Sequence, residues 1–157
     1  MKSVTLELEN FSPPSNNEIR RMNRWVYRKL VRGLRERIML ALGEGPWPKV
    51  TFDKCEHPKA MREAILKELQ KLWQPRETVY AETMIRRPRR FDSDNHHGGM
   101  KPLWDAIVRA GWLVDDHVKW LGILSLAQCI GDPKTIVMLH FPANEEEKRA
   151  LESRRVM

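Results

Sequence analysis

Residues 78–85 read Thr-Val-Tyr-Ala-Glu-Thr-Met-Ile and run directly into Arg-Arg-Pro-Arg-Arg at 86–90 and Asp-Ser-Asp-Asn at 92–95, with Phe91 between. β-Branched and aromatic residues favour a strand over 78–85. One side of this strand would carry Val79, Ala81, Thr83 and Ile85. Ligand-binding and catalytic groups commonly lie where a strand ends and a loop begins. The strand therefore predicts that the arginines and carboxylates stand at one end of a sheet.

The N-terminal part of the chain has the pattern of a strand, a turn and a long helix. Residues 4–9 alternate apolar with polar side chains, which indicates a strand with one buried face. Pro13-Pro14-Ser15-Asn16-Asn17 favours a turn and then a helix cap. Over 18–42, apolar residues recur at helical spacing and arginines fill the other faces. We expect one long amphipathic helix with a cationic surface, most of it a solvated charged face.

Two further helices are expected in the middle of the chain. Residues 49–54 suit a short strand, and 58–73 suit a helix that Pro58 would open. Gly98-Gly99 is expected to form a flexible break before the next helix. That helix would begin at Pro102 and end at Gly111 as its C-terminal cap.

The C-terminal part carries two β-prone runs and a capping signal. Residues 118–130 and 135–141 are apolar, and Gly131-Asp132-Pro133 between them predicts a hairpin. Asn144 with Glu147 three residues later is a capping-box pattern, so 143–157 is expected to be a terminal helix or a frayed tail.

Length and composition limit the class of protein. At 157 residues the chain is the size of one domain, and the order β-α-β-α-β-α-β-β-α predicts a single α+β (mixed α/β) domain over 1–157. Its net charge of +7 makes an acidic partner plausible, nucleic acid first. Cys55 and Cys129 have no metal or disulfide spacing and are expected to be buried thiols. No stretch is apolar enough for a membrane span or a signal peptide, so an intracellular protein without membrane contact is expected.

Two pairs of carboxylates carry the chemical hypothesis. Asp92 and Asp94 form one pair, and Asp115 and Asp116 follow about twenty residues later. Mg2+ prefers carboxylate and water oxygens, and clustered carboxylates repel one another unless a cation is present. Lys101 lies between the pairs and would neutralise charge on a transferring phosphate or leaving oxygen. The alternatives stay open: such pairs also occur in turns, caps and calcium loops, and Lys101 alone would be a surface lysine.

Histidines and tryptophans near these groups allow two interpretations each. His96 and His97 would bind a transition metal or act as a base, or they form a polar loop pair. His117 would orient Asp116 or be incidental. An aromatic side chain at an opened branch point would stack on a base, whereas core or rim packing is the simpler role. The tryptophans in question are Trp104, Trp112 and Trp120.

These residues, in this order, resemble the RusA family of Holliday junction endonucleases (crossover junction endodeoxyribonucleases). The motifs that carry the resemblance are Pro13-Pro14-Ser15-Asn16-Asn17, Asp92-Ser93-Asp94-Asn95, Lys101, Asp105-Ala106-Ile107, Ala110-Gly111 and Leu113-Val114-Asp115-Asp116. They cover the first strand with its loop and about 86–118. Lys101 stands four residues before Asp105, and Asp105 eleven before Asp116.

The resemblance implies a homodimeric, Mg2+-dependent resolvase, with Mn2+ as a substitute, that nicks four-way DNA junctions symmetrically in recombination or repair. It implies catalytic roles for Asp92, Asp94, Lys101 and Asp116. It implies metal binding by Asp92, Asp94, Asp115 and Asp116. DNA contacts are expected from the cationic run and the lysine, namely Arg86, Arg87, Arg89, Arg90 and Lys101. A cytoplasmic location, in a bacterial or phage-infected cell, follows from the same resemblance.

The chain departs from the family pattern at three places. The spacer between Asn95 and Lys101 is longer and contains glycine, a variant similar to phage-borne relatives. Phe91 separates the basic run from the first aspartate, and the 49–73 segment is extra. These departures bear on junction selectivity more than on cleavage. Two other hypotheses remain: a nuclease for flaps or forks, and a non-catalytic basic protein that binds nucleic acid.

Overall fold

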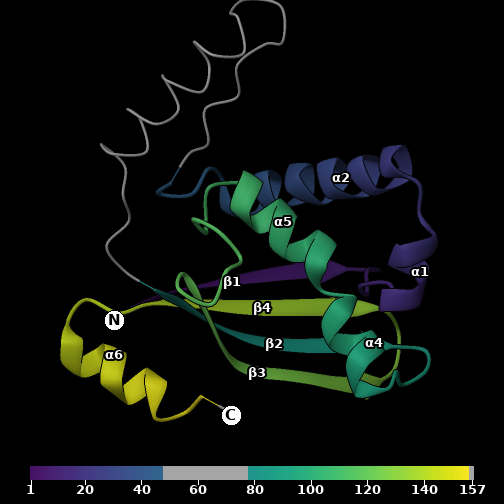
Figure 1. Cartoon of the computed structure of the whole chain (residues 1–157). Coiled ribbons are helices and arrows are strands. Elements are labelled where there is room, and N and C mark those ends of the chain that lie inside the picture. The colour runs from purple at the N-terminus through teal and green to yellow at the C-terminus, as the bar shows by residue number, and fades with distance from the viewer. Residues whose placement is uncertain (48–77, 156–157) are drawn as a thin grey trace, which may run out of the picture.

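The computed structural model describes residues 1–47 and 78–155 (Figure 1). The elements are, in chain order, β1 (Lys2–Glu9), α1 (Asn16–Arg21), α2 (Arg24–Leu42), β2 (Val79–Arg87), α4 (Ser93–Gly98), α5 (Lys101–Arg109), β3 (Leu121–Ile130), β4 (Lys134–Phe141) and α6 (Glu145–Glu152). The strand expected over 49–54 and the helix expected over 58–73 lie outside the described residues.

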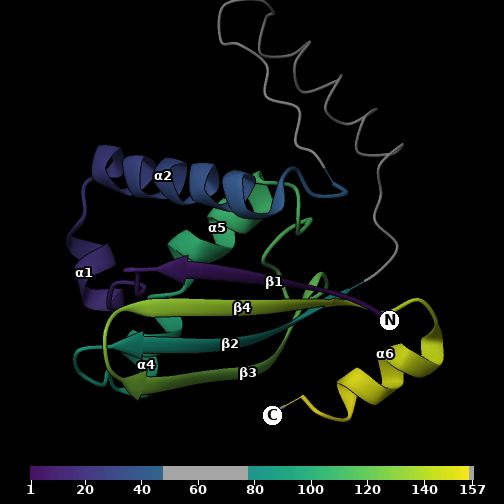
Figure 2. The ribbon, with the colours of Figure 1, turned by 180° about the vertical axis from the view of Figure 1, so that it is seen from behind.

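The four strands form one mixed sheet in the order β1-β4-β2-β3. β4 pairs antiparallel with both β1 and β2, while β2 and β3 run parallel. Figures 1 and 2 show α1, α2, α4 and α5 on one side of this sheet and α6 at the other end of the strands from α4. A mixed sheet packed with helices confirms the expected α+β class.

The main core lies between the sheet and the pair α2 and α5. Val31, Leu34 and Ile38 of α2 are buried there, together with Leu103 and Ile107 of α5. On the opposite side of the sheet, α6 contributes a small second cluster of Tyr80, Leu124 and Leu151. Successive strand residues point to opposite faces, so Tyr80 serves the second cluster while its neighbours serve the first.

Two helices replace the single helix expected over 18–42. The chain leaves helical geometry at Met22, whose φ is −70° and ψ 134°. Asn23 then caps α2, with its Oδ1 accepting the backbone N–H of Val26 at 2.9 Å. Ser15 and Glu18 form a capping box at the start of α1. An asparagine side chain that accepts a free N–H at a helix start favours the beginning of a new helix over the continuation of the previous one. The spacing of apolar residues alone does not reveal this break.

The hairpin expected around residues 131–133 is wrong, because β2 lies between β3 and β4. The short connection passes the end of β2, and the backbone N–H of Gly131 donates to the Arg87 carbonyl at 3.0 Å. A Cβ at Gly131 would stand 2.4 Å from Cδ of Arg86. β2 is the most buried strand and pairs along both edges. It therefore separates β3 from β4, although these two strands follow one another in the sequence.

Two other local expectations are met, and one is corrected. α5 covers the helix expected from Pro102, and Gly111 follows it at φ 82°, in the region that favours glycine. Asn144 caps α6, and its side chain accepts the backbone N–H of Glu147, as the capping pattern predicts. Cys129 is exposed, which corrects the expected buried thiol, and Cys55 lies outside the described residues. No helix in 1–47 or 78–155 is long and apolar enough to cross a membrane.

Candidate functional site

The Asp92-Ser93-Asp94-Asn95 stretch is the beginning of helix α4. Asp92 is the N-cap, with Oδ1 accepting the backbone N–H of Asn95 at 3.0 Å and Oδ2 accepting the Asn95 side-chain amide at 2.9 Å. The backbone bond and then the amide bond from Asn95 hold the pKa of Asp92 below its ordinary value. Asp94 is exposed in the first turn of α4. Asp92 therefore caps a helix, which is one of the alternative roles that the sequence left open for such pairs.

The proline-asparagine loop before α1 packs against α4. The backbone N–H of Asn17 donates to Oδ1 of Asn95 at 3.2 Å. A Cβ at Gly99 would stand 1.9 Å from the carbonyl oxygen of Pro14, and one at Gly98 would stand 2.4 Å from Cγ of Asn16. The two glycines permit this close approach because they have no Cβ, so their role extends beyond a flexible break before the next helix. Two motifs about 80 residues apart in sequence thus form one structural unit.

The arginine run divides into a buried member and exposed members. Arg87 is 1% exposed, places its guanidinium 4.1 Å from the Phe91 ring centroid, and lies 3.2 Å from Nδ1 of His96 through Nη2. Burial lowers the pKa of Arg87. The expectation that Arg87 contacts DNA is therefore corrected, because its side chain supports the loop from inside. The exposed arginines are Arg86, Arg89 and Arg90.

Two hollows flank Asp92. One, of about 360 Å³, is bordered by Arg21, Arg89, Arg90 and Asp92, with further walls from α1 and Asn95. The other, of about 470 Å³, is bordered by Arg90, Asp92 and His97 among others. Arg90 and Asp92 thus border both hollows. A phosphate in either one would meet an arginine next to a carboxylate.

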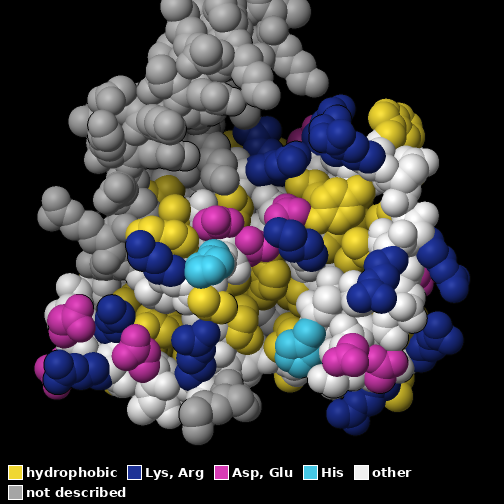
Figure 3. Space-filling view, in the orientation of Figure 1, with side chains coloured by type: hydrophobic (Ala, Val, Ile, Leu, Met, Phe, Trp, Pro, Cys, Tyr) yellow, Lys and Arg dark blue, Asp and Glu magenta, His cyan; other side chains and the backbone are white. Residues whose placement is uncertain are grey.

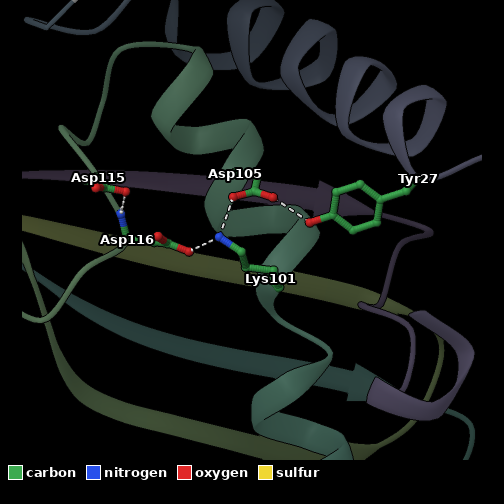
Figure 4. A network of polar contacts seen from close by, with 5 residues as sticks. All are labelled: Tyr27, Lys101, Asp105, Asp115 and Asp116. Carbon is green, nitrogen blue, oxygen red and sulfur yellow. Dashed lines mark hydrogen bonds and ion pairs between the residues drawn. The ribbon is translucent and has the colours of Figure 1, made fainter. Parts of the chain in front are cut away.

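Figure 4 shows a second polar cluster, centred on Lys101. Its Nζ donates to Oδ1 of Asp105 at 2.8 Å and to Oδ2 of Asp116 at 2.5 Å. The hydroxyl of Tyr27, from α2, donates to Oδ2 of Asp105 at 2.5 Å. Asp115 accepts the backbone N–H of Asp116 at 2.8 Å through Oδ1. Asp105 therefore holds the lysine from one side while a tyrosine holds Asp105 from the other.

Burial and charge compete at this cluster. Burial alone would lower the pKa of Lys101, but the hydrogen bonds and charges of Asp105 and Asp116 outweigh it and raise the pKa. Burial raises the pKa of Tyr27, and its bond to Asp105 raises it further. At neutral pH the lysine is therefore a cation and the tyrosine a neutral donor.

The structure brings some of the predicted residues together and leaves others apart. Lys101 meets Asp116, as well as Asp105 and Tyr27, which were not predicted as site residues. The four-residue spacing to Lys101 would have indicated Asp105, since residues four apart share a helix face. No sequence signal indicated Tyr27. Within 1–47 and 78–155, no three His, Cys, Asp or Glu side chains gather closely enough to hold a metal ion.

The acidic groups nevertheless share one face of the molecule. Figure 3 shows acidic side chains at the centre of this face and again over α4, with lysine and arginine side chains around both. The Lys101 cluster comes from α5 and the segment that follows it, and Asp92 and Asp94 come from α4. The two acidic groups therefore lie on one face of the molecule, each with basic side chains around it.

The three histidines near these groups differ in burial: His96 is buried, whereas His97 and His117 are exposed. His96 is 3% exposed, and its Nε2 lies 3.2 Å from the Leu126 carbonyl, which makes it a core histidine. Burial lowers its pKa. His97 is exposed and contacts the carbonyl of Ser93 through Nδ1 at 2.9 Å. His117 is exposed, and its Nδ1 accepts the backbone N–H of Lys119 at 3.3 Å. Among the tryptophans, Trp104 and Trp112 are buried, as core packing predicts.

Comparison with known proteins adds no family to this geometry. The chain matches no protein-family model, and no curated protein matches it significantly.

Proposed function

We propose that the chain is a Mg2+-dependent endodeoxyribonuclease, similar to the RusA family, that nicks branched DNA. Its main substrate in this proposal is the four-way junction. The observation that carries the proposal is the pairing of Lys101 with Asp116, two residues fifteen positions apart that were expected to act in one site. Exposed Asp92 and Asp94 lie on the same side of the sheet, and exposed Arg89 and Arg90 border a hollow beside Asp92, so these residues supply the remaining groups.

In this proposal the arginines bind the DNA backbone. Arg89 and Arg90 border a hollow beside Asp92, where a phosphate would receive charge-assisted hydrogen bonds. Lys101 remains protonated because its pKa is raised, so it is a fixed positive charge close to where negative charge develops. Tyr27 and Asp105 keep that charge in position.

The proposed metal is Mg2+, with Mn2+ as a substitute. Asp92, Asp94 and Asp116, with Asp115 adjacent, would supply its carboxylate oxygens, the donor type that a hard cation prefers. Mg2+ commonly takes one or two protein carboxylates and completes its shell with phosphate and water, so a preformed group of three is not required. When bound, the ion would lower the pKa of a water molecule and stabilise the departing oxyanion.

A homodimer is part of the same proposal. A four-way junction has two-fold symmetry, and two equivalent cuts require two equivalent sites. Each protomer would contribute one cluster centred on Lys101.

The direct test is cleavage of a synthetic mobile four-way junction in Mg2+. Wild type should produce paired nicks, Asp94→Asn should not, and Glu145→Gln should cut like wild type because Glu145 lies on α6, at the other end of the sheet. Equal absence of nicking in wild type and Asp94→Asn, across metals and salt, would reject an enzyme. Faster cutting of flaps or forks would keep the nuclease and change its substrate.

A non-catalytic nucleic-acid-binding protein is the second candidate. It is favoured by the local use of the carboxylates, since Asp92 caps a helix and Asp116 neutralises a lysine. This candidate predicts binding that weakens steeply with salt and is indifferent to Mg2+ and to Asp94→Asn. Against it, a pure phosphate binder gains nothing from carboxylates placed beside its arginines.

A further inference from the structure

The outer surface of α2 carries a dense group of exposed basic side chains. Its members are Arg24, Arg28, Lys29, Arg32 and Arg35. Arg20 and Arg21 of α1 are exposed immediately before them. Glu36 is the acidic residue of α2, which spans Arg24–Leu42. This arrangement gives α2 a strongly positive outer surface, which we call the α2 basic row.

The arginines of the row lie along the edge of α2 nearest α5, whereas Lys29 lies further round the helix toward solvent. Two contacts fix this orientation: Tyr27 reaches Asp105 on α5, and Nε of Arg35 donates to the carbonyl of Arg109 at 3.3 Å. Residues three or four apart share a helix face, so Arg24, Arg28 and Arg32 follow the same flank as Arg35. The row therefore runs beside the Lys101 cluster, and Figure 3 shows basic side chains along α2 at the upper edge of that face.

The row concentrates charges of one sign on a single helix. Within 1–47 and 78–155 these side chains form no ion pair with an acidic side chain, and Arg24, Arg28 and Arg32 repeat at four-residue spacing. Like charges at that spacing destabilise an isolated helix. An extended anion laid along the row would remove the repulsion, and a phosphodiester backbone has the matching charge.

Trp25 lies among the basic side chains of this row. It is 69% exposed in the first turn of α2, and Nζ of Lys29 lies 5.3 Å from its ring centroid. Trp104 and Trp112, by contrast, are each 8% exposed and cannot offer a ring face. An exposed indole among phosphate-binding cations is the arrangement on which unpaired bases stack.

We propose that the α2 basic row and Trp25 bind a single-stranded segment of DNA, with the arginines on phosphates and the indole against an unpaired base. A closed duplex offers no free base face, so the tryptophan selects single strands. The inference rests on the proposed function, because it names the path of an opened strand beside the Lys101 cluster.

The test measures binding of a labelled oligothymidylate by fluorescence anisotropy in EDTA, where no metal-dependent cleavage occurs. Trp25→Ala should weaken the Kd for the single strand roughly tenfold, and Trp25→Phe should retain most of the affinity. Leu40→Ala is the matched control, because Leu40 is 89% exposed on the same helix. Its affinity should equal that of wild type. A duplex of equal length should bind Trp25→Ala and wild type alike.

Salt dependence tests the arginines separately. Arg28→Ala with Arg32→Ala should reduce the slope of log K against log salt by about 1.4 for the single strand. Arg149→Ala with Arg155→Ala removes the same charge near α6 and should leave the slope unchanged. Unchanged single-strand binding by Trp25→Ala, an equal loss on duplex, or an equal slope change from the α6 pair would overturn the proposal. Binding measured without metal stands or falls independently of any nicking result.

Discussion

The start of α4 and the Lys101 cluster satisfy their charges in opposite ways. Asp92 is exposed, and its partner Asn95 is three residues away in the same helical turn. Lys101 is held by carboxylates from two segments, and one of these carboxylates is held in turn by Tyr27, which lies 78 residues from Asp105. The comparison shows that Asp92 finds its hydrogen-bond partner within one helical turn. Lys101, in contrast, acquires its partners Asp105 and Asp116, and the Tyr27 contact to Asp105, only when distant segments pack together.

Exposure follows the same division. The side chains of Asp105 and Asp116 are 25% and 23% exposed and that of Lys101 is 52% exposed, so their bonds are sheltered from solvent on the carboxylate side. Partly buried charge-assisted bonds hold geometry better than exposed ones. Changes in the Lys101 cluster should therefore affect activity strongly, and changes at the start of α4 should act through helix formation and metal or phosphate binding.

The largest effect is expected from Lys101→Met. Removing the fixed cation should lower the rate of junction nicking about 100-fold or more at saturating Mg2+. Single-turnover cleavage measures the loss, with thermal unfolding as the check on folding. Lys148→Met removes a lysine of α6 that pairs with Glu145 at 4.0 Å, and it should cut normally. Full activity in Lys101→Met would place the lysine outside the reaction.

The next effect separates the exposed arginines from the buried one. Arg89→Ala with Arg90→Ala should leave the thermal midpoint near that of wild type. It should reduce the salt slope of duplex binding by about 1.8. Arg87→Ala should instead lower the midpoint, because it removes a buried side chain stacked on Phe91, and should leave the slope alone. A slope change from Arg87→Ala with an unchanged midpoint would contradict this division.

A smaller effect is expected from Tyr27→Phe, which removes one hydrogen bond to Asp105. The free energy of unfolding should fall by roughly 1.5 kcal/mol, as for bonds to charged groups, measured by urea unfolding. Tyr80→Phe is the matched control, since its hydroxyl donates to Glu152 of α6 at 2.9 Å. Both variants should lose similar stability, but slower nicking is expected for Tyr27→Phe alone. Equal nicking by the two variants would show that Tyr27 does not position Lys101.

The smallest effect is the pH dependence of the Asp92 cap. Hydrogen bonds from Asn95 depress the pKa of Asp92 below its ordinary 3.8, so the carboxylate stabilises the fold above pH 3.8. That stability is lost as the pH falls through the lower folded-state pKa. The difference in thermal midpoint between wild type and Asp92→Ala should therefore shrink in acid. Asn23→Ala removes an uncharged cap from α2, and its difference should stay constant with pH.

Local patterns predicted much of the fold and less of the site. The caps at Ser15 and Asn144, the helix from Pro102 and the strand over 78–85 depend on neighbouring residues, so the chain reveals them directly. The predicted hairpin between residues 118–130 and 135–141 was wrong because β2 pairs with both β3 and β4 and lies between them. The proximity of Lys101 to Asp116 was expected from a resemblance, and no spacing in the chain requires it.

The arginine run shows why burial is harder to predict than charge. Arg86 and Arg87 are adjacent and chemically identical, yet Arg86 is exposed and Arg87 is 1% exposed. Strand alternation turns successive side chains to opposite faces. The face that α4 covers then takes Arg87 inside, beside His96 and Phe91.

By itself the sequence determined the α+β class, most helix and strand positions, and the basic charge. These properties arise from interactions among residues a few positions apart. Only the tertiary structure decided that β2 separates β3 from β4, that Arg87 is buried, and that Tyr27 and Asp105 hold Lys101 against Asp116. Those outcomes depend on contacts between distant segments, whose partners are chosen by the packing of the whole sheet and its helices.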